Sequence, residues 1–226
     1  VWQEDDVNAP FVDANGQTNG KTNGEVYKVK PGNSKYVDVN KDGVYNDADQ
    51  GIIGCGQPTF NWGWNNTFNY KNFDFSFFVV GFYGFDIYNA THQMGYNLIK
   101  SQQMAGVTPM RELLNRWTPT NTNTDIPGFV KGGTENKDFF STRFVENGSF
   151  IKMKSITLGY TLPEATCRSL GINNLRVYAS VQNPFHITKY SGLDPEATMG
   201  SPLVQGVDWG AYPNSRNYLI GLNFSF

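Results

Sequence analysis

The sequence predicts an all-β chain with long antiparallel strands, and three observations support this fold class. Aromatic residues make up 15% of the 226 residues and glycine occurs 24 times, whereas charged residues make up only 17%. Aromatic side chains suit a pleated sheet, and glycine serves turns and bulges. Five segments alternate between apolar and polar residues, and the connections between them are alternately short and long.

Residues 1–58 precede the first expected strand and contain an acidic pattern at residues 38–49. Oxygen ligands at alternate positions can wrap one cation as the chain turns, and Gly43 at position six permits the sharp turn. The pattern ends in Asp where an EF-hand prefers Glu, and no strong amphipathic helix flanks it, so we expect structural Ca²⁺ rather than a regulatory EF-hand. An acidic turn without an ion is the alternative. The expected ligands are Asp38, Asn40, Asp42, Val44 through its carbonyl, Asn46 through a water, and Asp49.

The alternating segments predict five strands. In the first, aromatic side chains occupy one face from Phe60 to Tyr70 and polar side chains the other, with Asn66 as the exception. The second loses its alternation at Phe78 and Val80. Each strand therefore has an apolar and a polar face. The expected ranges are about 59–71, 73–85, 149–162, 175–185 and 216–226.

The apolar faces could meet a protein core, as in a β-sandwich, or lipid, as in a transmembrane barrel. The segments are about 10–14 residues long, against about 5–6 in globular proteins and about 9–11 in tilted membrane strands. The short connections are Lys71–Asn72 and 163–174, and the long ones are 86–148 and 189–215. Outer-membrane barrels combine short periplasmic turns with long outer loops, so we expect a transmembrane barrel with long extracellular loops.

In that arrangement the last strand runs from outside to inside, and Phe226 lies at the periplasmic rim. Five strands are too few to close a barrel, and an open edge in lipid would leave backbone groups unsatisfied. We therefore expect the missing strands to precede Val1 in the same protein. The alternative is a secreted, calcium-stabilised, carbohydrate-binding β-sandwich, which would be soluble without detergent as a folded monomer.

Several other classes of protein are disfavoured. The most apolar stretch, 73–85, is shorter than the roughly 20 residues of a membrane-spanning helix. The net charge of −2 offers no basic surface for nucleic acid. Cys55 and Cys167 have no metal-ligand spacing, and free thiols are favoured over a disulfide.

No enzymatic activity is expected. His92 and His186 are the only histidines, and neither has a nearby Ser or Cys in a nucleophile-elbow setting. Asp194 and Glu196 could suggest glycoside hydrolysis, but they lie in a Gly- and Pro-rich loop, where we expect them to be solvated. Short helical turns are expected within 92–117.

A series of motifs runs through nearly the whole chain in one order. They are Lys35–Gly43, Ile53–Gly54, Pro58–Gly63, Tyr70–Phe75, Arg116–Pro119, Thr124–Pro127, Arg143–Lys152, Ile156–Pro163, Leu175–Tyr178, Gln182–Asn183, Gly206–Asp208, Tyr212–Pro213 and Gly221–Phe226. This series resembles the late region of SusC/RagA-type TonB-dependent transporters of Bacteroidetes. Cys55, Cys167 and Pro184 depart from the family pattern.

The resemblance implies a 22-stranded antiparallel barrel in the outer membrane, with an N-terminal plug that is absent from this chain. It also implies energy supplied by TonB through that N-terminal part, and a SusD-like surface lipoprotein as partner. The implied cargo is an oligosaccharide or a peptide, and the residues that contact it are not identified. Partner contacts are expected within 86–148 and 189–215.

Overall fold

A computed structural model describes residues 1–96, 109–128, 140–169, 171–199 and 204–225. The contacts divide the chain into two units, Val1–Ile53 with Thr91–Ser141, and Gly54–Ala90 with Thr142–Phe226. This division differs from the expected boundary near residue 58, because part of the expected loop 86–148 packs with the N-terminal residues. Gly128 N–H, for example, donates to Gly32 O at 2.8 Å.

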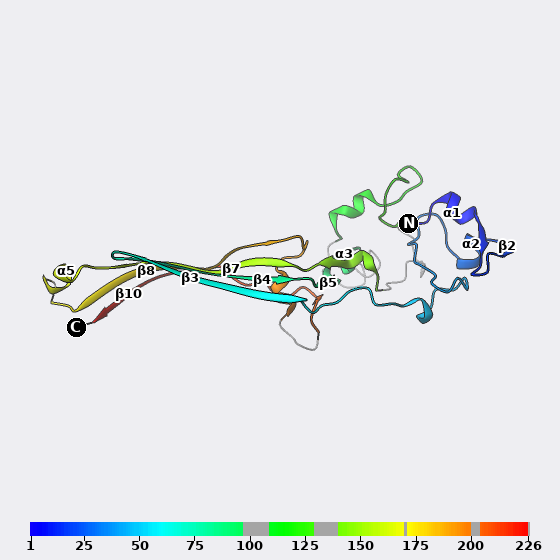
Figure 1. Cartoon of the computed structure of the whole chain (residues 1–226). Coiled ribbons are helices and arrows are strands. Elements are labelled where there is room, and N and C mark those ends of the chain that lie inside the picture. Colours follow the sequence, from blue (N-terminus) through cyan, green and yellow to red (C-terminus); the bar gives the residue numbers. More distant parts are fainter. Residues whose placement is uncertain (97–108, 129–139, 170, 200–203, 226) are drawn as a thin grey trace. The chain divides into compact units, whose positions relative to one another are not determined.

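The second unit is built on a five-stranded antiparallel sheet in the order β10-β8-β7-β4-β3. Figure 1 shows these strands side by side, with α5 (Glu164–Ser169) at one end and β5 (Asp86–Asn89) at the other. One long strand falls on each expected range, and the fourth runs three residues further than expected. Within the described residues the sheet is open, not closed. The strands are β3 (Phe60–Tyr70), β4 (Phe73–Tyr83), β7 (Phe150–Thr161), β8 (Asn174–Thr188) and β10 (Asn217–Ser225).

The pairing register carries the alternation across all five strands, because directly paired residues point to the same face. The result is a sheet with an apolar face and a polar face. One apolar row is Phe68, Phe75, Leu158, Ala179 and Ile220. The adjacent polar row is Thr67, Ser76, Thr157, Ser180 and Leu219.

A bulge interrupts β7 and β8 near their middle. Between the paired residues Met153–Phe185 and Ser155–Gln182, β7 has Lys154 while β8 has Asn183 and Pro184. Proline lacks the N–H that a ladder needs, and so a bulge accommodates it within a strand. Asn183 precedes it with φ +50°, a left-handed conformation that Asn tolerates. The bulge therefore accommodates Pro184, which departs from the family pattern, and β8 continues on both sides of it.

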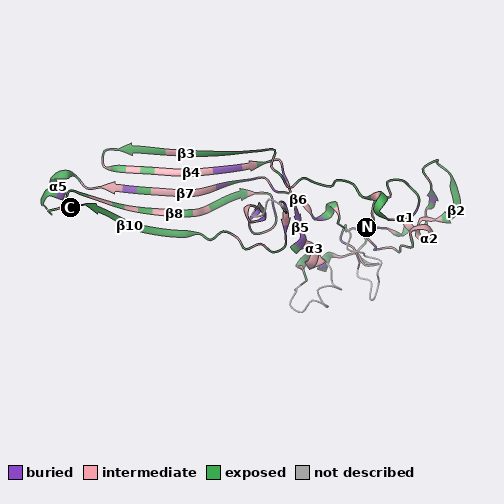
Figure 2. Ribbon diagram, turned by 90° about the horizontal axis from the view of Figure 1, so that it is seen from below, coloured by how far each residue is buried: buried purple, intermediate pink, exposed green. Residues whose placement is uncertain are grey.

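A smaller sheet lies at the β5 end, in the order β6-β5-β9, formed by β5 with β6 (Val145–Asn147) and β9 (Val207–Asp208). The main buried cluster of this unit is nearby and consists of Phe85, Ile87, Phe150 and Tyr190, with Phe82 packed against it. Figure 2 shows buried segments of β4 and β7 at this same end, whereas β3 and β10 are largely exposed.

The first unit consists of short elements around aromatic contacts. Tyr27 stacks on Tyr45 with ring centroids 5.0 Å apart, and Phe11 meets Tyr27 edge-on. Among the described residues no helix is long and apolar enough to cross a membrane. The expected helical turns within 92–117 are present as α3 and η2, while 97–108 lie outside the described residues. The elements are α1 (Glu4–Asn8), β1 (Pro10–Val12), β2 (Thr18–Thr22), α2 (Asn23–Tyr27), η1 (Asp47–Asp49), α3 (Ala90–Tyr96) and η2 (Arg111–Asn115).

Candidate functional site

The polar face of the long sheet carries a buried group of charges near the β5 end. The side chain of Lys152 in β7 is 2% exposed, and its Nζ lies 2.8 Å from Asp194 Oδ2 and 2.7 Å from Glu196 Oε2. Lys154, two residues further and therefore on the same face, pairs with the other oxygen of Glu196. Both carboxylates come from the connection between β8 and β10, at η4 (Pro195–Met199) and just before it.

Asn214 completes this group, which we call the Lys152 cluster: Lys152, Lys154, Asp194, Glu196 and Asn214. The backbone N–H of Asn214 donates to Asp194 Oδ2 at 3.1 Å, and its Nδ2 donates to Glu196 Oε2 at 2.9 Å. Burial by itself would raise the pKa of Asp194, but the bonds from Lys152 and Asn214 hold that pKa below its usual value.

The expectation that Asp194 and Glu196 are solvated is wrong for Asp194, which is 4% exposed. Glu196 is also largely covered, with 18% of its side chain exposed. The physical reason is the pair of lysines on β7, which compensates the two charges once the connection folds back onto the sheet. No pair of carboxylates is left free for acid–base chemistry here.

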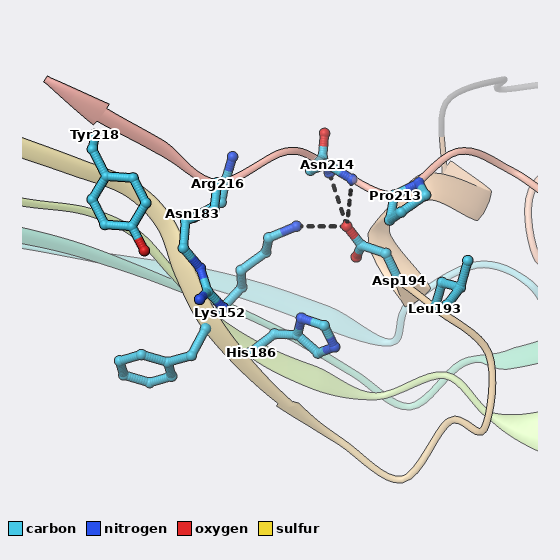
Figure 3. Close-up of a pocket in the computed structure, with 10 residues that line it drawn as sticks. Lys152, Asn183, His186, Leu193, Asp194, Pro213, Asn214, Arg216 and Tyr218 are labelled. Carbon is cyan, nitrogen blue, oxygen red and sulfur yellow. Dashed lines mark hydrogen bonds and ion pairs between the residues drawn. The ribbon is translucent and has the colours of Figure 1, made fainter.

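A pocket of about 380 Å³ lies beside the cluster. Figure 3 shows the Lys152 ammonium and the Asn214 amide both directed at the Asp194 carboxylate, with His186 nearby. The lining offers hydrogen-bonding groups and apolar surface together, as small-molecule sites do. It consists of Lys152, Asn183, Phe185, His186, Leu193, Asp194, Pro213, Asn214, Arg216 and Tyr218.

A second ion pair crosses the polar face nearer the other end of the sheet. Arg176 of β8 donates to Asp74 of β4 through Nε at 2.9 Å, and the pair spans β7, which lies between those strands. Gly159 of β7 makes room for it, since a Cβ there would lie 2.3 Å from Asp74 Oδ1 and 2.5 Å from Arg176 Nη2. The polar face therefore carries ion pairs at two places along the strands, the Lys152 cluster near the β5 end and the Arg176–Asp74 pair nearer the other end.

The apolar face is exposed. Ile220 is 85% exposed and Trp64 is 54% exposed, although both are large apolar side chains. Aromatic rings pack against one another along this surface, as where Trp64 meets Phe77 edge-on at 5.2 Å. The indole of Trp62 covers Gly81, where a Cβ would approach it to 2.3 Å. A contiguous apolar surface of this extent requires a covering medium or partner.

The acidic loop 38–49 folds around Asp38. The Asp38 carboxylate accepts from the N–H of Gly43 at 2.8 Å and from the Tyr27 hydroxyl at 2.9 Å. Gly43 has φ +82°, as a sharp turn at position six requires. N–H groups of Asn46 and Val39 lower the pKa of Asp49. Burial raises the pKa of Tyr45 to about 12, with a further contribution from the charge on Asp38.

The donor set of this loop has the chemistry that Ca²⁺ prefers, namely carboxylate, amide and carbonyl oxygens. In the structure these side-chain oxygens accept hydrogen bonds from backbone N–H groups. Val44 N–H donates to Asp42 at 2.8 Å, for instance, and Ala48 N–H donates to Asn46 at 2.7 Å. In the arrangement of the described residues, no three His, Cys, Asp or Glu side chains are gathered as the ligands of a metal ion would be.

His92 and the two cysteines are the remaining residues that the sequence singled out. His92 contacts Glu112 at 3.3 Å, and Tyr96 donates to the same carboxylate, whose pKa these two bonds lower. Cys55 is an exposed free thiol and Cys167 a buried one, which confirms the expectation of free thiols over a disulfide.

Comparison with known proteins identifies the relatives of the chain. TonB-dependent receptor P3 of Formosa agariphila is 36% identical over 202 residues, covering 87% of this chain and 19% of that protein. TonB-dependent receptor SusC of Bacteroides thetaiotaomicron is 32% identical over 199 residues, covering 87% of this chain and 18% of that protein. No family model matches.

Solved structures agree with these relatives. The RagAB peptide importer in its closed-closed state matches with a TM-score of 0.66 and 26% identity, over 95% of this chain and 20% of that chain. The RagAB peptide transporter matches with a TM-score of 0.63 and 28% identity, over 76% and 17%.

The chain belongs to the SusC/RagA family of TonB-dependent receptors. It spans about a fifth of the length of the curated relatives it matches. The relatives of this SusC/RagA chain are named as receptors and transporters rather than as enzymes.

Sequence reasoning about this SusC/RagA chain missed the Lys152 cluster. One signal was available, because apolar residues at Val80 and Phe82 stand at positions that the alternation assigns to the polar face. A face that changes from polar to apolar along one strand indicates that its outer part is covered.

Proposed function

We propose that this chain forms part of the barrel wall of a TonB-dependent importer in the outer membrane. The carrying observation is the sheet itself, in which five long strands keep one exposed apolar face in register while the other face is polar. A lipid-facing surface and a wet interior need this arrangement. The 22-stranded closed barrel expected from the family would supply the remaining strands.

The proposed orientation follows from the two ends of the sheet. The turn Lys71–Asn72 and the short α5 connection lie at one end, which we assign to the periplasm together with the end of β10. The long connections 86–148 and 189–215 lead from the other end, which we assign to the cell exterior. Trp62 and Trp64, near that end, would lie in the aromatic belt of the membrane interface.

The proposed partners are the plug and the rest of the barrel in the same protein, TonB through the N-terminal part, and a SusD-like lipoprotein at the surface. The proposed cargo is an oligosaccharide or a peptide. Support for a peptide comes from the RagAB structures, which are described as a peptide importer. The mechanism is transport without bond chemistry, in which the wall and outer segments hold solute until the plug moves.

The alternative, a secreted carbohydrate-binding sandwich, is less well supported. In a sandwich the apolar face is packed against a second sheet. Residues such as Ile220, at 85% exposed, and Leu222, at 60% exposed, are instead open over the described part of the chain.

The proposal is tested with the full-length protein in its native cell. We expect it in the outer-membrane fraction, and we expect deletion of its gene to abolish uptake of one class of solute among labelled oligosaccharides and peptides. Restoring the intact gene should restore that uptake. Recovery of the full-length protein as a water-soluble folded monomer would support the sandwich instead.

We also propose that loop 38–49 binds one structural Ca²⁺. The spacing of Asp38, Asn40 and Asp42, together with the turn at Gly43, supports this. Binding of the ion would break some of the hydrogen bonds that the carboxylates now accept from backbone N–H groups and would bring the carboxylates closer together.

Calcium removal gives a direct test at Lys41, an exposed residue inside the loop. We expect a chelator to accelerate tryptic cleavage after Lys41, because the ion would hold that backbone in place, and added Ca²⁺ to reverse the effect. Cleavage after the exposed Lys21 in β2 is the control and should not change. Equal cleavage at Lys41 with and without chelator would contradict an occupied site.

A further inference from the structure

The polar face of the sheet is covered over its outer part. Two paired rows there contain apolar or buried residues where the alternation calls for exposed polar ones. Val80 pairs with Lys152, and Phe82 pairs with Phe150. Phe150 and Lys152 are each 2% exposed. Toward the other end, the same face carries Ser, Thr and Asn side chains. Something therefore rests on this face near the β5 end.

The covering element belongs to the connection between β8 and β10. We call its described residues, 189–199 and 204–215, the covering segment. Tyr190 begins it and packs into the cluster with Phe85 and Phe150. Its hydroxyl bonds Asp208, and burial together with that bond raises the pKa of Tyr190. Tyr190 therefore attaches the covering segment to the sheet through apolar packing.

Hydrogen bonds with β5 and β6 fix two parts of the covering segment, around Ser191 and around Gly206, to the rest of the unit. Through β9 it pairs in parallel with β5, and Tyr88 N–H donates to Gly206 O at 2.7 Å. Gly206 has φ +76°, and a Cβ there would lie 2.5 Å from the Cα of Gly56. Ser191 N–H donates to Glu146 of β6 at 2.8 Å.

The Lys152 cluster fixes the covering segment near its start, through Asp194 and Glu196, and at its end, through Asn214. Asp194 and Glu196 lie on the segment, whereas Lys152 and Lys154 lie on the sheet. Lifting the segment away would separate these charges. Any partial opening that kept water out would leave Lys152 buried without a counter-charge, which is strongly unfavourable.

We propose that the covering segment forms a fixed inner cover on the polar face, not a lid that swings open during transport, and that Lys152 is the positioning residue that holds the cover in place. This rests on the proposed function, because only in a closed barrel does the polar face line the passage. The solute then passes beside the cover and meets its exposed side at Leu193, which borders the pocket together with Arg216, just before β10.

The first experiment measures hydrogen exchange of backbone amides in the full-length protein. In Lys152→Met we expect amides of the covering segment to exchange at least ten times faster than in the wild type, while β7 and β8 stay protected. Lys152→Arg should restore most of the protection. If Lys152→Met does not fold, the same measurement is made on Asp194→Asn, which removes one charge, keeps the side-chain size and should also accelerate exchange in the covering segment.

Arg168→Met is the matched control. Arg168 pairs with Glu164 at 3.3 Å, but their side chains are 82% and 85% exposed, so its loss should leave exchange in the covering segment unchanged. Unchanged exchange in both Lys152→Met and Asp194→Asn would overturn the positioning role of Lys152.

The second experiment locks the cover with a disulfide. Tyr88 and Val207 are direct partners between β5 and β9, so Tyr88→Cys with Val207→Cys, in a Cys55→Ser background, ties the segment down. We expect uptake to differ less than two-fold between the oxidised and reduced forms. Loss of uptake on oxidation with recovery on reduction would show that the segment must open, and would overturn the inference. If the wild type takes up no solute, the proposed function fails, and the exchange data alone decide whether the cover is fixed.

Discussion

At the scale of single residues, the polar face shows how a sheet tolerates charge. Lys152 is buried because two carboxylates reach it, and Arg176 bridges to Asp74 because the intervening residue, Gly159, has no side chain. The first arrangement would be lost if a carboxylate were removed, and the second if a methyl group were added at Gly159. Each therefore predicts a sharp response to a small substitution.

Gly159→Ala should displace the ion pair above it. A methyl group placed 2.3 Å from Asp74 Oδ1 must push the carboxylate or the strand aside. We expect a loss of about 1–3 kcal/mol in the free energy of unfolding, as for other overpacked sites. Gly63→Ala is the control, since its nearest neighbour, Phe78 Cε2, lies 3.2 Å away and needs to yield only slightly. Guanidinium unfolding of the full-length protein measures both, and equal losses would argue against the displacement.

The lowered pKa of Asp194 predicts a pH dependence. A carboxyl whose folded-state pKa is depressed contributes stability above its unfolded pKa, and this contribution disappears as the pH falls through the folded value. We therefore expect the difference in unfolding temperature between wild type and Asp194→Asn to stay constant from pH 8 to pH 5 and to shrink below about pH 4. A difference that already shrinks between pH 8 and pH 5 would contradict the assignment.

At the scale of elements, the five long strands could be predicted from the sequence, but the bulge in β7 and β8 and the Lys152 cluster could not. Period-two alternation is a local property, so β3 and β10 follow from their own residues. The bulge opposite Pro184 depends on how two strands pair. The Lys152 cluster joins residues 42 and 44 positions apart, and no local pattern indicates which carboxylate a lysine will meet.

Neighbouring residues of β10 provide the sharpest test of the two faces. Ile220 lies on the apolar face and Leu219 on the polar face. In lipid, Ile220→Arg should cost about 2–4 kcal/mol of folding free energy if it lies near the membrane centre, because the charge must leave water. Leu219→Arg should cost much less, since in the proposed barrel its side chain would face the wet interior. Denaturant titration of the full-length protein in lipid measures the difference, and a reversed order would refute the assignment of faces.

At the scale of the whole molecule, the open sheet explains why the chain reads as part of something larger. Its outermost strands, β3 and β10, each have one edge without a partner strand among the described residues. Unpaired edges and an exposed apolar face both promote association. In the barrel proposed above, other strands would cover the edges and lipid would cover the apolar face.

The 226-residue chain alone should therefore not be a soluble monomer. Expressed in water without detergent, we expect it to aggregate, and we expect the full-length protein in detergent to stay monodisperse. Size-exclusion chromatography with light scattering distinguishes these states. A stable monomer of the chain alone in water would favour the secreted sandwich over the barrel wall.

The burial of Lys152 also has a consequence for the order of assembly. Its side chain is 2% exposed, and its ammonium group is compensated by the two carboxylates of the covering segment. An early sheet in which β7 and β8 were paired without that segment would keep Lys152 in water, and later closure would have to dehydrate the charge and its partners together. The segment should therefore dock while β8 is still pairing with β7. Pulse labelling of amides during refolding should show protection of both appearing in a single kinetic phase.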